Sequence, residues 1–324
     1  MIVPQFWAEG RAQQRQGQRS FTVRRFGWSD QGQEAAQAHA DARAQEAPQR
    51  LLAGQTLPRR ELKCPYPGGG VPVREGIVMR DGDTIITRNA YGARCLNTPD
   101  VLFADIDFSS APSLPLLLWI YALLLLAVLA AASLAEWRWL WIVLTILAGL
   151  FGGTIARVVH PRALALRGGA EIAARRRIER FLRAHPDWNL RLYRTPAGMR
   201  VLATHRLFRA DEPEVTACFR ALGADPIYAR MCTSQNCFRA RVSAKPWRIG
   251  IAQHLRPRPG VWPVRPEALP QRQVWIERYE QAASGFAACG FLAALGSGAV
   301  HPQARRVQGL HDELCRASLP LPLA

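Results

Sequence analysis

The sequence predicts an α+β fold, with a mixed sheet and flanking helices, that is interrupted by a hairpin of two membrane-spanning helices. Two uncharged stretches within residues 113–157 predict the hairpin, since each approaches the roughly 20 apolar residues that cross a bilayer. β-Hairpin and helical patterns alternate on both sides of these stretches and predict the sheet and its helices. We therefore expect residues 1–112 and 158–324 to be the two halves of one cytoplasmic domain.

The transmembrane hairpin has recognisable boundaries. The uncharged stretches cover 114–135 and 139–156, and Glu136 and Arg138 separate them. Tryptophans gather at this turn, as in the aromatic belt of a membrane interface; they are Trp137, Trp139 and Trp141. The alternative is a helical hairpin buried in the core of a soluble protein.

Positive charge predicts the orientation of the hairpin. Arginines follow the second stretch directly, at Arg157, Arg162, Arg167 and 175–177. Such residues remain in the cytoplasm, so both soluble segments of a multi-pass inner (cytoplasmic) membrane protein are expected there. The seven scattered cysteines agree, because an odd, unpatterned set is typical of a reducing compartment. The first residues contain no apolar run typical of a signal peptide.

The chain is strongly basic, and the charge comes almost entirely from arginine. Its 324 residues carry a formal net charge of +17 at pH 7, with Lys63 and Lys245 as the lysines. Such an excess favours anionic partners, either nucleic acid or an anionic lipid surface.

The remaining patterns predict the elements of the soluble halves. Residues 1–20 are rich in Gln, Arg and Gly and are expected to be poorly ordered. A strand at 21–28, a helix at 34–53, a β-hairpin at 76–88 and a buried strand at 101–108 follow. After the membrane we expect a helix at 168–184, a hairpin of strands 189–195 and 199–205, a helix at 212–222, a strand at 237–245 and a helix at 271–295.

Two carboxylates share one face of the strand at 101–108. Asp105 and Asp107 alternate with Ala104, Ile106 and Phe108, and side chains two apart in a strand point the same way. Paired charges on an apolar strand need a cationic partner, and Mg²⁺ or Mn²⁺ held by carboxylates would serve phosphoryl transfer. The alternatives are a solvent-facing pair or an aspartate that caps the next loop.

The strand at 237–245 carries a row of basic and hydroxyl side chains. Arg239 and Arg241 alternate with apolar residues, and Ser243 and Lys245 continue the same face. Guanidinium and ammonium groups in a row suit the oxygens of a triphosphate. The alternative is a solvated basic strand.

The segment VLFADIDF resembles the hydrophobic-Asp-x-Asp strand of the archaeo-eukaryotic primase superfamily, which includes the primase-polymerases. The segment from Asp225 to Lys245 resembles the third motif of that superfamily; the matching residues are Asp225, Tyr228, Asn236, Phe238, Arg239, Ser243 and Lys245. The resemblance covers roughly residues 75–110 and 186–250. It implies a primase-polymerase-like fold and a catalytic metal site formed by Asp105, Asp107 and Asp225.

This sequence differs from the superfamily at the second motif. The superfamily has a small residue, a variable residue and a histidine that contacts the nucleotide, whereas this chain has Gly198-Met199-Arg200. His205 lies further along the strand and out of register. Arg200 is then expected to contact phosphate, and the departure leaves open whether the site is active.

Other chemical motifs are weaker. Cys232, Cys237, His254 and Cys289 could bind zinc, but their spacing is loose and buried free thiols are favoured. The sequence contains no G-x-S-x-G elbow and no Walker-type phosphate loop.

These patterns predict a membrane-anchored, primase-polymerase-like protein that binds nucleotide or nucleic acid with Mg²⁺ or Mn²⁺. If the site is active, its reaction is nucleotidyl transfer. One alternative is a catalytically degenerate binder of nucleic acid or nucleotides at the membrane. Another is a basic membrane scaffold that binds anionic lipid. The sequence does not indicate any protein partner.

Overall fold

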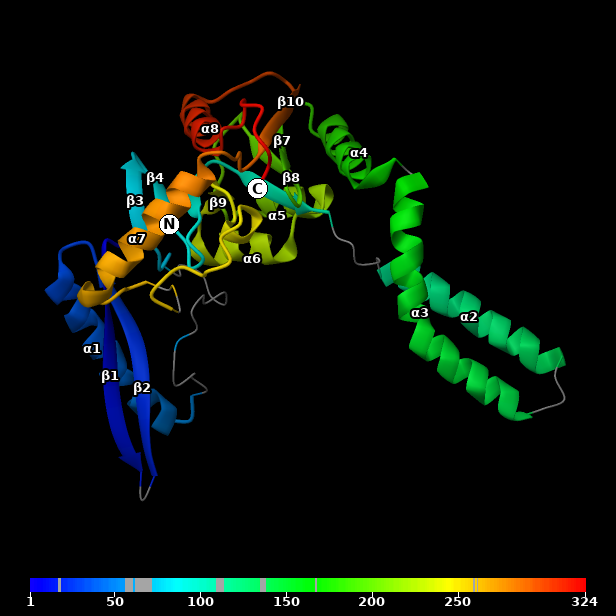
Figure 1. Cartoon of the computed structure of the whole chain (residues 1–324), viewed down its shortest axis with the longest axis horizontal. Helices are drawn as coiled ribbons and strands as arrows, with labels where there is room; N and C mark the ends of the chain where they lie inside the picture. Colours follow the sequence, from blue (N-terminus) through cyan, green and yellow to red (C-terminus); the bar gives the residue numbers. More distant parts are fainter. Residues whose placement is uncertain are drawn as a thin grey trace.

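The computed structural model describes residues 1–16, 19–55, 61, 72–108, 114–134, 138–166, 168–258, 260 and 262–324. It is a mixed α/β protein in which a helical hairpin and a small N-terminal unit extend from a body of sheets and helices (Figure 1). This confirms the mixed class and the two apolar helices that the sequence predicts.

The body contains two four-stranded sheets. The first has the order β10-β7-β8-β6, and its strands are β6 (Phe103–Asp107), β7 (Asn189–Thr195), β8 (Gly198–Ala203) and β10 (Gly290–Gly296). The second has the order β3-β4-β5-β9, and its strands are β3 (Gly76–Asp81), β4 (Thr84–Arg88), β5 (Arg94–Thr98) and β9 (Phe238–Arg241). The strand pairs in both sheets are antiparallel.

Each sheet combines strands from both sides of the helical hairpin. β6 precedes the hairpin and pairs with β8, which follows it. β5 and β9 are related in the same way. One buried cluster joins Leu96 and Phe103 to Val201 and Phe238. The segments before and after the helical hairpin therefore contribute to one core.

The helices α4 (Gly169–Ala184) and α5 (Pro213–Leu222) agree with the predicted elements. The C-terminal region does not. The helix expected at 271–295 ends early, as α7 (Leu269–Ala283), and the chain then forms β10 against β7. The helices α6 (Pro226–Gln235) and α8 (Pro302–Cys315) were not predicted.

The N-terminal unit corrects the expectation of disorder over residues 1–20. β1 (Phe6–Gln16) pairs along its length with β2 (Arg19–Ser29), and α1 (Gln33–Leu52) covers them. Glycine permits this close packing, because a Cβ at Gly27 would lie 2.1 Å from the backbone nitrogen of Ala40. Polar composition misled the prediction, since an antiparallel partner satisfies the backbone of a polar strand.

The helices α2 (Leu114–Leu134) and α3 (Arg138–Leu166) form the hairpin, and both are long and apolar enough to cross a membrane. Their apolar side chains face outward: Leu118 is 61% exposed and Leu150 is 68% exposed. Such exposure differs from a hairpin buried in a soluble core. α3 continues to residue 166, past the expected boundary at 157.

Candidate functional site at the junction of the two sheets

The predicted carboxylates lie where the two sheets meet. β6 and β9 are edge strands of their sheets and contact each other. On β6, Ala104 and Ile106 are buried, whereas Asp105 is partly exposed and Asp107 is exposed. This alternation matches the face predicted for Asp105 and Asp107.

Asp105 already has a cationic partner. Arg200 lies opposite it on β8, and the guanidinium donates from Nε to Oδ1 at 2.7 Å and from Nη2 to Oδ2 at 3.1 Å. Arg200 is only 2% exposed, and its Nη1 donates to the carbonyl oxygen of Arg241 at 2.9 Å. Burial alone would lower the pKa of Arg200, but the charge and hydrogen bonds of Asp105 raise it above its ordinary value. Arg200 therefore binds Asp105 and is not free to contact phosphate.

Asp225 approaches the same strand from the start of α6. Its backbone N–H donates to the carbonyl oxygen of Asp105 at 2.9 Å. Its carboxylate caps α6, because it accepts from the N–H groups of Ile227 and Tyr228 at 3.0 and 3.3 Å. The capping aspartate precedes a proline at the first helical position, which is a favoured start for a helix.

The charges of Asp105 and Asp225 both act on the carboxylate of Asp107. Although the Asp107 side chain is exposed, the neighbouring protein removes part of its water, and this partial desolvation raises its pKa. The charges of Asp105 and Asp225 raise the pKa further, while Lys245 and Arg248 lower it. The structure therefore brings Asp105, Asp107, Asp225 and Lys245 into one electrostatic neighbourhood.

Lys245 and Arg248 follow β9 and form a basic loop together with Arg241. Burial lowers the pKa of Lys245, and the charges of Arg241 and Arg248 lower it further. Among the described side chains, Nη1 of Arg248 is buried and has no hydrogen-bond partner. An unsatisfied guanidinium nitrogen beside like charges is suited to an anion.

Two of the predicted nucleotide-binding residues, Arg239 and Ser243, form contacts within the protein interior instead. Arg239 is 7% exposed and pairs with Glu75 at 2.7 Å. The hydroxyl of Ser243 accepts from the backbone N–H of Arg94 at 2.8 Å and lies 2.6 Å from the hydroxyl of Tyr279. β9 ends at Arg241, so the expected continuous basic face does not extend along one strand.

The basic loop also contains an aromatic residue, Trp247, that was not among the predicted site residues. Trp247 is 53% exposed between Lys245 and Arg248 in the chain. Its ring meets that of Tyr91 edge-on, with centroids 5.2 Å apart, and Nζ of Lys245 lies 5.5 Å from its centroid. The sequence contained a signal for it, since Trp247 lies between Lys245 and Arg248. Surfaces that bind nucleic acid combine basic and aromatic side chains in this way.

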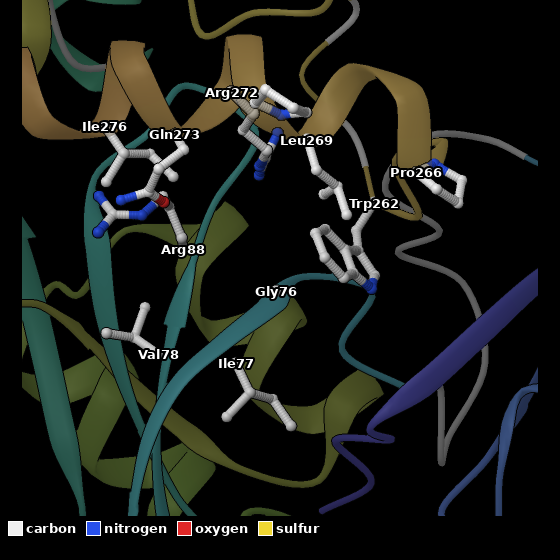
Figure 2. Close-up of a pocket in the computed structure, with 11 residues that line it drawn as sticks. Gly76, Ile77, Val78, Arg88, Trp262, Pro266, Leu269, Arg272, Gln273 and Ile276 are labelled. Carbon is white, nitrogen blue, oxygen red and sulfur yellow. The ribbon is translucent and has the colours of Figure 1, made fainter.

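A separate pocket lies between β3 and α7 (Figure 2). Its volume is about 640 Å³, and its lining includes Ile77, Arg88, Trp262, Arg272 and Ile276. Arg88 pairs with Glu280 at 2.6 Å. Burial lowers the pKa of Arg272 to about 10. None of the predicted site residues lines this pocket.

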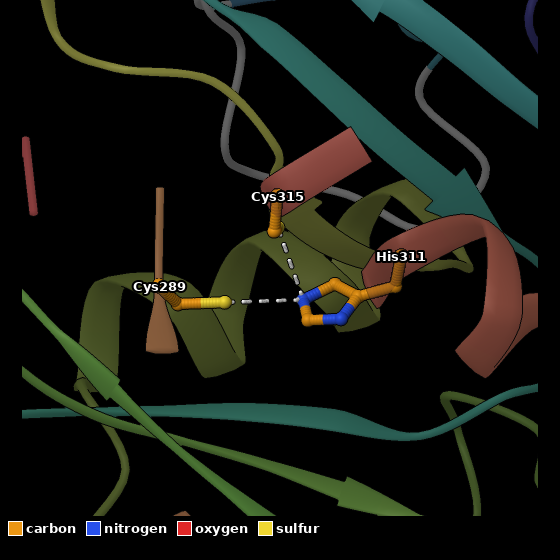
Figure 3. A group of neighbouring side chains, drawn as sticks. All are labelled: Cys289, His311 and Cys315. Atoms are coloured by element: carbon orange, nitrogen blue, oxygen red, sulfur yellow. Dashed lines mark hydrogen bonds between the residues drawn. The ribbon is translucent and has the colours of Figure 1, made fainter. Parts of the chain in front are cut away.

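The C-terminal region gathers a second group of side chains, formed by Cys289, His311 and Cys315 (Figure 3). Among the described residues, it is the group whose potential ligand atoms all lie within 4.8 Å of one another. The carboxylates of Asp105, Asp107 and Asp225 are not gathered in this way. Cys289 belonged to the zinc set considered from the sequence, whereas Cys232 and Cys237 are buried elsewhere as free thiols.

Comparisons with protein-family models, curated proteins and solved structures find no match to the chain. The superfamily resemblance thus rests on the quoted sequence motifs alone.

Proposed function

We propose that the protein is a membrane-anchored, non-catalytic binder of nucleotide or nucleic-acid phosphate groups. The observation that carries the proposal is the ion pair between Arg200 and Asp105. It places a guanidinium on the carboxylate that would otherwise serve as the central metal ligand.

The ion pair opposes two-metal chemistry. A metal ion at Asp105 would have to compete with a guanidinium that donates to both carboxylate oxygens. Breaking a buried pair leaves an uncompensated charge, at a cost of about 3–5 kcal/mol. Asp225 is also occupied, because its carboxylate caps α6. Asp107 is the member of the trio without such a hydrogen bond among those described.

The basic loop supports phosphate binding. Lys245 has no acidic partner among the described ion pairs, and Arg248 has an unsatisfied buried nitrogen. Trp247 exposes a ring beside them, and stacking of one base on such a ring contributes about 1–3 kcal/mol. The loop therefore combines a charge that suits phosphate with an aromatic surface that suits a base.

The helical hairpin supports a location in the membrane. α2 and α3 would span the inner (cytoplasmic) membrane. The arginines after the second span would keep both soluble segments in the cytoplasm, where nucleotides and nucleic acid are available.

The second candidate is an active nucleotidyltransferase that uses Mg²⁺ or Mn²⁺. The observation that favours it is the raised pKa of Asp107, which burial and two neighbouring carboxylates cause. A divalent cation at this point would relieve their repulsion. A basic scaffold that binds only anionic lipid is the third possibility.

Binding and incorporation assays on the full chain in detergent separate these functions. We expect a fluorescent single-stranded oligonucleotide or ATP to bind equally with Mg²⁺ and with chelator, and no nucleotide to be incorporated. Lys245→Ala should weaken binding by about 1–3 kcal/mol, the scale of a charged hydrogen bond. Arg209→Ala is the control, because Arg209 is 76% exposed and lies in another loop.

Each contrary result selects another function. Metal-dependent incorporation that Asp107→Asn abolishes would establish the nucleotidyltransferase. Absence of any nucleotide or oligonucleotide binding, together with binding to anionic lipid vesicles, would establish the scaffold.

A further inference from the structure

We propose that Cys289, His311 and Cys315 form a binding site for a zinc-class divalent cation, distinct from the carboxylates on β6. Cys289 immediately precedes β10, and His311 and Cys315 lie one turn apart on α8. All three side chains are fully buried. Figure 3 shows the two cysteines directed at the same imidazole nitrogen.

The distances fit a tetrahedral ion. Nε2 of His311 lies 3.4 Å from Sγ of Cys315 and 3.9 Å from Sγ of Cys289. Zinc bonds of about 2.3 Å to sulfur and about 2.0–2.1 Å to nitrogen would separate a sulfur and a nitrogen by about 3.6 Å in a tetrahedron. The two observed separations lie on either side of this value, so small side-chain rotations would close the site.

The imidazole is oriented for coordination. Nδ1 of His311 lies 3.0 Å from Oδ1 of Asp312, and Arg191 holds the other oxygen of that carboxylate at 2.8 Å. A carboxylate on the outer nitrogen is the usual support for a metal-binding histidine. It fixes the tautomer in which Nδ1 carries the proton and Nε2 has a free lone pair for a metal.

The guanidinium of Arg200 adjoins the proposed site. Its Nη1 lies 3.3 Å from Nε2 of His311. A bound cation would require this long contact to be released, but Arg200 would retain its bonds to Asp105 and to the carbonyl of Arg241. Two thiolates would neutralise a divalent ion, so the guanidinium would face a site without net charge. The soft sulfur ligands favour zinc over magnesium.

The ion would join the end of the chain to the sheet that carries Asp105. α8 holds two ligands, and the third adjoins β10 at the sheet edge. The fourth tetrahedral position would be open to water or another small ligand, as it is in zinc sites with three protein ligands.

Metal content and cobalt spectroscopy test the proposal on the full chain, purified in detergent under reducing, chelator-free conditions. We expect about one zinc per chain by mass spectrometry of the metal. After zinc removal, added Co²⁺ should give thiolate charge-transfer and tetrahedral ligand-field bands. Cys289→Ser and Cys315→Ser should each weaken Co²⁺ binding at least tenfold. Cys218→Ser should retain it, because Cys218 is an equally buried free thiol on α5.

Thermal unfolding of the metal-free protein, with and without added Zn²⁺, distinguishes loss of the metal site from loss of the fold in a variant. Wild type and Cys218→Ser should gain stability from Zn²⁺, whereas Cys289→Ser should not. The proposal is overturned if reduced wild type gives no cobalt spectrum or no gain from Zn²⁺, or if both serine variants at the site still bind. A Cys289–Cys315 disulfide in freshly purified wild type, with no metal bound after reduction, would replace the metal site with a redox pair.

Discussion

Arg200 and Asp105 lie opposite each other on β8 and β6, and the buried guanidinium forms two hydrogen bonds with the carboxylate. The pair joins the two sheets, because the same guanidinium donates to the carbonyl oxygen of Arg241 on β9. Arg200 also reaches His311 on α8. One side chain thus connects the carboxylates on β6 to the proposed metal site.

Arg200→Met should destabilise the protein by about 1–3 kcal/mol, because it leaves the carboxylate of Asp105 and the carbonyl oxygen of Arg241 without their donor. The matched control is Arg209→Met, whose ion pair with Asp211 has side chains 76% and 52% exposed. An ion pair between two exposed side chains contributes little to stability, because water screens both charges. Chemical unfolding of the full chain in detergent, followed by tryptophan fluorescence, measures both. A similar decrease in the free energy of unfolding for both variants would mean that the Arg200–Asp105 pair does not hold the two sheets together.

Asp107→Asn should stabilise the protein at neutral pH by up to about 1 kcal/mol, the scale of interactions between exposed charges. Burial and two neighbouring carboxylates raise the pKa of Asp107 above 3.8, so ionisation opposes folding. The loss of stability caused by ionisation of Asp107 is complete at pH values above its raised pKa. It disappears as the pH falls below the ordinary pKa of an aspartate. The advantage of the variant should therefore vanish in acid.

Asp81→Asn is the control for the pH dependence of stability, because its effect on stability should have the opposite sign. A hydrogen bond from Arg306 lowers the pKa of Asp81, so its ionised form favours folding above the ordinary value. Asp81→Asn should lower stability at neutral pH. If both variants shift stability in the same direction, the carboxylate cluster around Asp107 does not repel as described.

Local patterns predicted much of this fold. Alternation along VLFADIDF indicated a strand with both aspartates on one face, and β6 has this form. The two long apolar helices followed from composition alone. These features depend on neighbours in the sequence.

Features that depend on distant segments were not predictable. The opposition of Arg200 and Asp105 requires the register between β6 and β8, which a shift of one residue would destroy. β10 is rich in alanine and leucine, which also suit a helix, and it becomes a strand because the edge of β7 is available. Cys289 and His311 meet only after β10 and α8 have docked.

Gly198→Ala should cost about 1–3 kcal/mol of stability. A Cβ at Gly198 would lie 1.9 Å from the carbonyl oxygen of Ile106, so β6 must move where it presents Asp107. Gly285→Ala is the control, since no atom lies within 4 Å of its added Cβ. Chemical unfolding of both variants measures the effect. Wild-type stability of Gly198→Ala would show that β6 accommodates the added methyl group without cost.

Topology can be checked by cysteine labelling of intact cells with a membrane-impermeant reagent. Glu136→Cys, at a position outside the described residues, should be labelled from outside because it lies between the two spans. Gln281→Cys, on an exposed position of α7, should be labelled only after the membrane is permeabilised. The native cysteines that the structure describes are all buried, and Cys64→Ser in every labelled chain removes the remaining one.

Reporter fusions provide the independent measurement of the same arrangement. A reporter inserted after residue 60 and another at the C-terminus should both give cytoplasmic signals, because two spans return the chain to its starting side. The pairing of β6 with β8 requires the same result, since strands on opposite sides of a bilayer cannot form one sheet. Opposite locations for the two reporters would therefore refute both the hairpin topology and the shared sheet. Labelling of Gln281→Cys in intact cells would instead reverse the orientation and place the basic loop outside the cytoplasm.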